Sequence, residues 1–159
     1  MGSRSSEHIA YIAGFLDGDG SLMLQMKKRS DSARGFRFMT TICLYQDSRH
    51  EQELRWMKKV LGVGYISARD DGISELRVQG YERVLDTLLL FRPYLRFKRV
   101  QCQTLIAACR LLNSKKLKDM TDGDLKKVID FMLVIQSHNY VTKKKRSKEE
   151  LYAQLGLTP

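Results

Sequence analysis

The spacing of apolar residues along this chain changes from a helical period to a strand period. Residues at i, i+3, i+4 and i+7 near the N-terminus form one apolar helical face: Ile9, Ile12, Ala13 and Leu16. From 21 to 29, and again from 37 to 46, apolar and polar residues alternate as in half-buried strands. The first part of the chain is therefore expected to form a helix and a β-hairpin, with a turn at 32–35.

The order of helix, strand and strand then recurs. Ser48 and Glu51 have the spacing of a capping box that opens a helix, and strands at 65–69 and 73–79 are expected to pair around a turn. The remaining helices are expected at 81–91, at 98–113, at 121–136, and after a capping box at 147–150, ending near Gly156. This pattern predicts an α+β fold of αββαββα order, in which a four-stranded antiparallel sheet has helices on one face and water on the other.

The open face of this sheet is expected to carry long polar side chains. They are Gln25, Lys27, Arg29, Arg37, Arg69, Glu75, Arg77 and Gln79. Guanidinium, amide and carboxylate groups have the donor and acceptor patterns that read base edges in the DNA major groove, and β-ribbons can enter that groove. The pattern predicts a DNA-binding face, and its alternative is a sheet face that is merely solvated.

The net charge favours a nucleic-acid partner. The 159-residue chain has 28 Lys and Arg against 18 Asp and Glu, a formal charge of +10. Sequence-independent contacts to phosphates are expected from three consecutive residues, Lys143, Lys144 and Lys145. We expect an N-terminal extension (1–6), one core domain (7–137) and a basic C-terminal tail with a short helix (138–159).

Several other classes of protein are disfavoured. No apolar run approaches the roughly 18 residues of a membrane helix, and the N-terminus lacks a signal-peptide layout, so neither membrane insertion nor secretion is expected. Cys102 and Cys109 are too far apart on one expected helix to form a disulfide. His8, His50 and His138 are far apart in sequence, which disfavours a zinc site. An intracellular, reducing compartment fits, and the sequence does not distinguish an organelle from a prokaryotic cytoplasm.

The expected first helix ends in two acids interleaved with glycines, D-G-D-G at 17–20. Glycines permit turn conformations, so that Asp19 can project from the helix end and the Gly18 carbonyl can be exposed. An EF-hand starting here fails, because Leu22 stands where glycine is needed and Lys28 where glutamate is needed. An ordinary Asp-Gly turn and a metal or catalytic site both remain possible.

Taken whole, the run Y-I-A-G-F-L-D-G-D-G-S at 11–21 closely resembles the signature helix of the LAGLIDADG homing endonucleases, and the order of elements is similar to that family's core. The resemblance implies that Asp19 binds a catalytic divalent metal beside the Gly18 carbonyl. It also implies that Gln46 organises active-site water and that Lys98 lies close to the scissile phosphate. The implied cofactor is Mg²⁺, with Mn²⁺ as a substitute, and the implied reaction is phosphodiester hydrolysis.

Only one such helix occurs in the chain, so one chain is expected to supply half of a site. Cutting both strands of a duplex then requires a C2 homodimer, and the helices would cross at small residues, Ala10, Ala13 and Gly14. The expected function is metal-dependent double-strand cleavage of a long pseudo-palindromic DNA. The alternatives are an intron maturase or DNA-binding relative without cleavage, and a basic structural or ribosome-associated domain.

Overall fold

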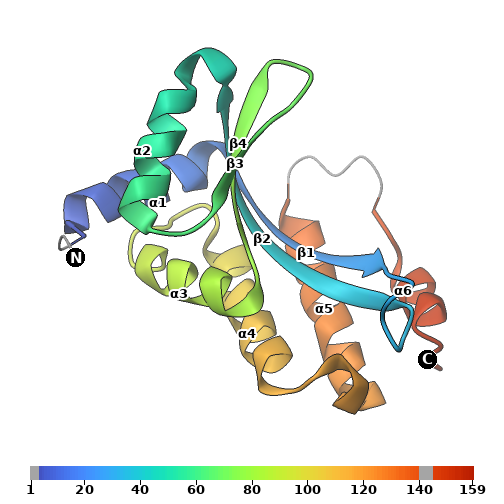
Figure 1. The fold of residues 1–159 in the computed structure, drawn as a ribbon. Coiled ribbons are helices and arrows are strands. Elements are labelled where there is room, and N and C mark those ends of the chain that lie inside the picture. The colour runs from blue at the N-terminus through green and yellow to red at the C-terminus, as the bar shows by residue number, and fades with distance from the viewer. Residues whose placement is uncertain (1–3, 140–144) are drawn as a thin grey trace.

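The computed structural model of the protein describes residues 4–139 and 145–159 (Figure 1). The helices and strands are α1 (Ser6–Asp19), β1 (Gly20–Lys28), β2 (Phe36–Asp47), α2 (Glu51–Leu61), β3 (Tyr65–Ala68), β4 (Ile73–Gln79), α3 (Tyr81–Phe91), α4 (Arg99–Ser114), α5 (Asp122–His138) and α6 (Lys148–Gln154). Short 3-10 helices lie at Ser48–His50 and Leu117–Asp119. This order confirms the predicted α+β, αββαββα arrangement.

The four strands form one antiparallel sheet in the order β1-β2-β4-β3. The hairpins therefore lie next to each other, with β2 and β4 paired at the centre of the sheet. Lys27 on β1 lies opposite Arg37 on β2, and Cys43 on β2 lies opposite Arg77 on β4. Because opposite residues in an antiparallel pair point to the same face, this register places the predicted polar positions of the strands on one side.

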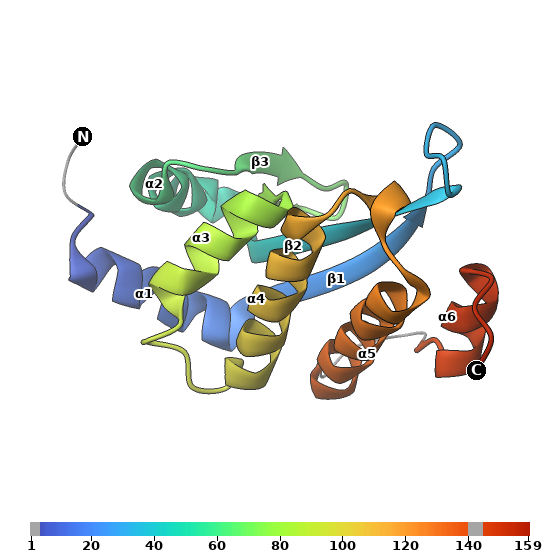
Figure 2. The same cartoon turned by 90° about the horizontal axis from the view of Figure 1, so that it is seen from below.

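The helices cover the other face of the sheet (Figure 2). Helix α1 is capped by Ser5, whose side chain accepts a hydrogen bond from the His8 N–H. Its apolar face packs into a core shared with the inner face of the sheet and with α3, α4 and α5. This core includes Ile12, Leu16, Leu22, Ile42, Leu44, Leu88, Phe91, Leu105 and Val128. All three cysteines are buried and free.

One of the two predicted capping boxes is wrong. Before α2 the side chain of Asp47 accepts the Arg49 N–H and a 3-10 turn intervenes, while Glu51 accepts a hydrogen bond from the Ser74 hydroxyl instead of returning to Ser48. Glu51 is therefore bonded to Ser74 of β4 in place of the predicted contact with Ser48. The second box, Ser147 with Glu150, forms as predicted.

The C-terminal residues that the structure describes belong to the same packed unit as the core. Helix α6 packs against α5, and Leu151, Tyr152 and Leu157 are buried in the core. The expected boundary at 137/138 falls in the last turn of α5. Lys143 and Lys144 lie outside the described residues, and Lys145 is exposed. None of the described helices has the length and apolarity needed to cross a bilayer.

Candidate nucleic-acid and metal site

Helix α1 passes directly into β1 at Gly20. A Cβ atom at this position would lie 2.9 Å from Leu16 Cα, closer than real Cβ atoms come, and 3.0 Å from the Cys43 carbonyl oxygen. The backbone of Gly20 is extended, with φ −106°, and Gly18 is still helical. The expectation that both glycines supply turn freedom is therefore wrong, since Gly20 is needed for close packing at the helix–strand junction.

Asp17 has a structural role that sequence reasoning did not assign to it. Its buried carboxylate accepts hydrogen bonds from three consecutive backbone N–H groups just before α4: Arg96 at 2.7 Å, Phe97 at 3.0 Å and Lys98 at 2.8 Å. Burial opposes ionisation of this carboxyl, but the three N–H groups outweigh burial and hold the pKa of Asp17 below its ordinary value. Both oxygens of Asp17 are therefore occupied.

Lys98 is held at the end of α1 by the same contacts. Its Nζ donates a hydrogen bond to the Asp17 carbonyl oxygen at 2.8 Å, and its side chain is buried. Burial lowers the pKa of the Lys98 ammonium, although the negative charges of Asp17 and Asp19 oppose this effect. The lysine is thus a fixed hydrogen-bond donor beside the helix end.

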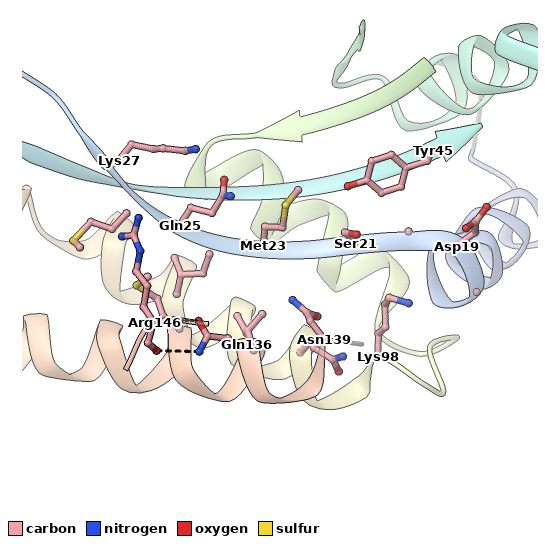
Figure 3. A pocket seen from close by; sticks show the side chains of 17 residues that line it. Asp19, Ser21, Met23, Gln25, Lys27, Tyr45, Lys98, Gln136, Asn139 and Arg146 are labelled. Carbon is pink, nitrogen blue, oxygen red and sulfur yellow. Dashed lines mark hydrogen bonds between the residues drawn. The ribbon is translucent and has the colours of Figure 1, made fainter. Parts of the chain in front are cut away.

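Asp19, Gly18 and Lys98 line one end of a pocket of 650 Å³ that runs along β1 (Figure 3). Gln25 and Lys27 line its far part, and α5 together with Asn139 and Arg146 forms the opposite wall. Pocket residues from α4, from α5 and from beyond α5 that were not expected in the site are Gln101, Met132, Ile135, Gln136, Asn139 and Arg146. The pocket therefore joins the motif acid and the lysine to the polar face of the sheet.

Gln46 lies outside this pocket. It is half-buried at the end of β2, and its Oε1 accepts the Asp47 backbone N–H at 2.8 Å. Its neighbour Tyr45 lines the pocket instead, because successive residues of a strand point to opposite faces. A count of alternation from Leu44 would have identified Tyr45.

The sheet residues predicted to bind DNA share one face, but their side chains are not equally free. Arg29 and Arg69 lie just beyond the ends of their strands, and Arg29 forms a bidentate pair with Asp31. Gln79 accepts a hydrogen bond from the Tyr65 hydroxyl at 3.1 Å. Glu75 is buried, and its carboxylate is paired with two arginines, so it is not free for a direct contact in this structure. Gln25, Lys27, Arg37 and Arg77 remain accessible from this face.

Of the three small residues predicted at a helix crossing, Ala13 is fully buried in the protomer's own core and cannot contact another subunit. Ala10 is half-buried and Gly14 is exposed, so the accessible side of α1 includes Gly14, the residue next to Ala13, and not Ala13 itself. Tyr11 is 61% exposed on this side of the helix, and Phe97, next to Lys98, is 73% exposed. We use the term α1 face for the exposed residues Tyr11, Gly14 and Gly18 of α1 together with Phe97, whose backbone N–H is bonded to Asp17 near the end of the helix.

The donors available for a divalent cation fit half of a site. Asp17 is occupied, whereas the carboxylate of Asp19 is exposed and has no hydrogen-bond partner among residues 4–139 and 145–159. Within the same residues there is no group of three or more acidic, histidine or cysteine side chains able to hold a metal. Mg²⁺ is commonly bound by one or two carboxylates together with substrate phosphates and water, so one free carboxylate per chain suits a shared site.

Comparisons with known proteins agree with this geometry. Residues 12–105 match the family model described as LAGLIDADG endonuclease. The chain is 31% identical over 107 residues to the DNA endonuclease I-CvuI of Chlorella vulgaris, a match that covers 67% of this chain and 66% of that protein. It is 28% identical over 117 residues to the DNA endonuclease I-CreI of Chlamydomonas reinhardtii, covering 70% and 68%.

Solved structures extend the likeness to nearly the whole chain. A crystal structure of the homing endonuclease I-CvuI with its target in the presence of Ca superposes with a TM-score of 0.85 at 25% identity, covering 97% of this chain and 98% of that one. The homing endonuclease I-TnaI shares the fold, with a TM-score of 0.74 at 19% identity and coverage of 93% and 95%.

Proposed function

This chain belongs to the LAGLIDADG endonuclease family, and we propose that it is a homing endonuclease that cuts both strands of a long, pseudo-palindromic DNA as a homodimer. The observation that carries the proposal is the free carboxylate of Asp19 beside the fixed Lys98, at the end of a pocket that continues onto a polar sheet face. The relatives I-CvuI and I-CreI are named DNA endonucleases, which supports the same reaction class.

Asp19 and the Gly18 carbonyl would hold Mg²⁺, for which Mn²⁺ can substitute. When bound, such an ion neutralises charge on the phosphate and increases the nucleophilicity of water. Lys98 presents its Nζ toward the same end of the pocket and would stabilise the negative charge that develops on the phosphate and the leaving 3′-oxygen. Because Lys98 is held by Asp17, little reorganisation is needed as that charge appears.

Gln46 would position water rather than act as a base, because a neutral amide cannot take up a proton at neutral pH. Its Oε1 is bonded to the Asp47 N–H and the residue lies outside the pocket, so this role requires that hydrogen bond to be broken and the side chain to turn toward Asp19. A Gln46→Ala variant that cleaves at the wild-type rate would remove Gln46 from the mechanism.

We propose that the second half of the site comes from a second copy of the chain. The α1 face exposes Gly14 and Gly18, where an added Cβ would meet nothing within 4 Å inside the protomer. Backbones can approach closely over such positions, and Tyr11 and Phe97 would lose much exposed apolar surface in the contact. A two-fold axis through the α1 face would bring the two Asp19 residues toward one another.

The proposal is tested by incubating the protein with a randomised duplex library and Mg²⁺ and sequencing the cut ends. A pseudo-palindromic consensus flanking paired strand breaks is expected, and an Asp19→Asn protein run in parallel should give none. A consensus recovered by binding alone, without cut ends, would support the DNA-binding alternative. If the protein neither cuts DNA nor binds a specific sequence, the proposed function is refuted.

A further inference from the structure

Glu75 places a buried negative charge at the centre of the sheet face proposed to meet DNA. Its side chain is 6% exposed, and it lies opposite Tyr45 on one neighbouring strand and Ser67 on the other. Its carboxylate accepts hydrogen bonds from Arg77 Nε at 2.6 Å and from Arg69 Nη1 at 3.3 Å. A buried carboxylate needs such partners, and here both partners are residues that the sequence nominated for DNA contact.

The two arginines are left in different states by this contact. Arg69 is bonded at both terminal nitrogens, through Nη1 to Glu75 and through Nη2 to Asp71 at 2.6 Å. Arg77 is bonded only through Nε, and its Nη1 and Nη2 have no partner in the part of the chain that the structure describes. A fixed guanidinium with a free terminal edge is therefore present at Arg77 and not at Arg69.

The side chain of Arg77 is partly accessible from the polar face of the sheet. Arg77 lies between Cys43 on β2 and Tyr65 on β3, and its side chain is 29% exposed. The Nε contact with Glu75, on the same strand and face, fixes the side chain along the sheet. Two parallel N–H donors in one plane match the O6 and N7 acceptors that guanine presents in the major groove.

We propose that Arg77 recognises a guanine in each half of the DNA target through Nη1 and Nη2, and that Glu75 is the positioning residue that fixes its guanidinium. This inference rests on the proposed function. Glu75 and the terminal nitrogens of Arg69 make no direct base contact in this arrangement. Arg69 instead helps to neutralise Glu75, so that a carboxylate can be placed close to a polyanion.

Arg37 provides a matched comparison on the same face. It is exposed, and it makes no ion pair among the described residues. Any base preference that depends on Arg37 should therefore be independent of Glu75, whereas a preference that depends on Arg77 should require it. The difference separates positioning by Glu75 from a general effect of losing a buried charge.

The experiment measures relative binding in Ca²⁺ and relative cleavage in Mg²⁺ for every single base-pair variant of the target recovered from the randomised library. Arg77→Lys should lose most of a preference of roughly 5- to 150-fold for G·C at one position in each half-site, with the other positions retained. Glu75→Gln should weaken the preference at the same position. Arg37→Ala should change a different position and leave the Arg77 position intact.

Thermal melts of each variant show whether it is folded. If Glu75→Gln is unstable, Arg77→Lys still tests the inference, because it keeps the positive charge beside Glu75. The inference is overturned if Arg77→Lys leaves every guanine preference intact. It is also overturned if a folded Glu75→Gln protein loses affinity equally at all positions, since Glu75 would then have only a structural role. A wild-type protein that selects no DNA sequence would instead refute the proposed function itself.

Discussion

Asp17 and Lys98 form two reciprocal hydrogen bonds, each between the side chain of one residue and the backbone of the other. The Asp17 carboxylate accepts the Lys98 backbone N–H at 2.8 Å, and the Lys98 Nζ donates to the Asp17 backbone carbonyl at 2.8 Å. This reciprocal contact couples the end of α1 to the start of α4 and fixes the lysine relative to Asp19. The two aspartates of the motif therefore differ: Asp17 supports the fold, and Asp19 is free for the metal binding proposed above.

Asp17→Ala should destabilise the fold by about 1–3 kcal/mol and also slow cleavage, because it leaves buried N–H groups unpaired and releases Lys98. The pKa of Asp17 is lowered in the folded state, so its contribution is complete above the ordinary carboxyl pKa of about 3.9 and disappears as the pH falls through the lowered value. Urea unfolding of the wild-type and Asp17→Ala proteins between pH 2 and 7 should show a difference in the free energy of unfolding that becomes smaller only in acid. A difference that persists unchanged at the lowest pH would contradict this role of the Asp17 carboxylate.

Asp19→Asn should abolish cleavage while leaving stability and specific binding near wild type. The substitution removes the charge of the proposed metal ligand with little change of shape, and Asp19 is exposed. Cleavage assays in Mg²⁺, paired with binding assays in Ca²⁺, check it. Normal cutting by a folded Asp19→Asn protein would disprove the proposed metal site.

Lys98→Met should slow cleavage about 100-fold or more and change stability at neutral pH only slightly, because the lost hydrogen bond to Asp17 is offset by removal of a buried charge. Burial lowers the pKa of Lys98 in the folded state, so the unfolded chain binds this proton more tightly. Stability should consequently rise as the pH increases from the lowered value toward the ordinary pKa of about 10.4, and this rise should be absent in the variant. Equal losses of binding and cleavage would reassign Lys98 to simple phosphate contact.

Gly14→Leu should prevent dimer formation without unfolding the protomer, since a side chain there meets nothing within 4 Å of its Cβ inside the chain. Gly20→Ala is the matched control, because its Cβ would collide with Leu16 and the Cys43 carbonyl and should destabilise the fold. Light scattering and thermal melts separate the two effects. A wild-type protein that is monomeric at micromolar concentration without DNA would count against the α1 face as an interface.

Replacing Lys143, Lys144 and Lys145 by Gln should weaken binding to all DNA sequences alike. Each lost phosphate contact should reduce the slope of log K against log salt by roughly 0.9, because fewer counterions are released. Titrations at several salt concentrations with matched and scrambled duplexes measure this change. A shift in base preference would show that these lysines read sequence.

The sequence by itself determined the order of elements, the face of the sheet on which each strand residue lies, and the acid that ends the motif helix. Strand alternation and helical spacing are local and periodic, so they can be counted along the chain. The motif singled out Asp19 and Gly18, and the looser family match at Lys98 proved to point to the same pocket.

Tertiary structure decided which of these side chains are free. Asp17 is occupied by N–H groups about 80 positions away, Glu75 is enclosed by Arg69 and Arg77, and Ala13 is buried while Gly14 is exposed. Such states depend on neighbours that meet only after the chain has packed, and periodicity does not encode which neighbour arrives. The residue types were therefore readable from the sequence, whereas their remaining hydrogen-bonding capacity was set by the fold.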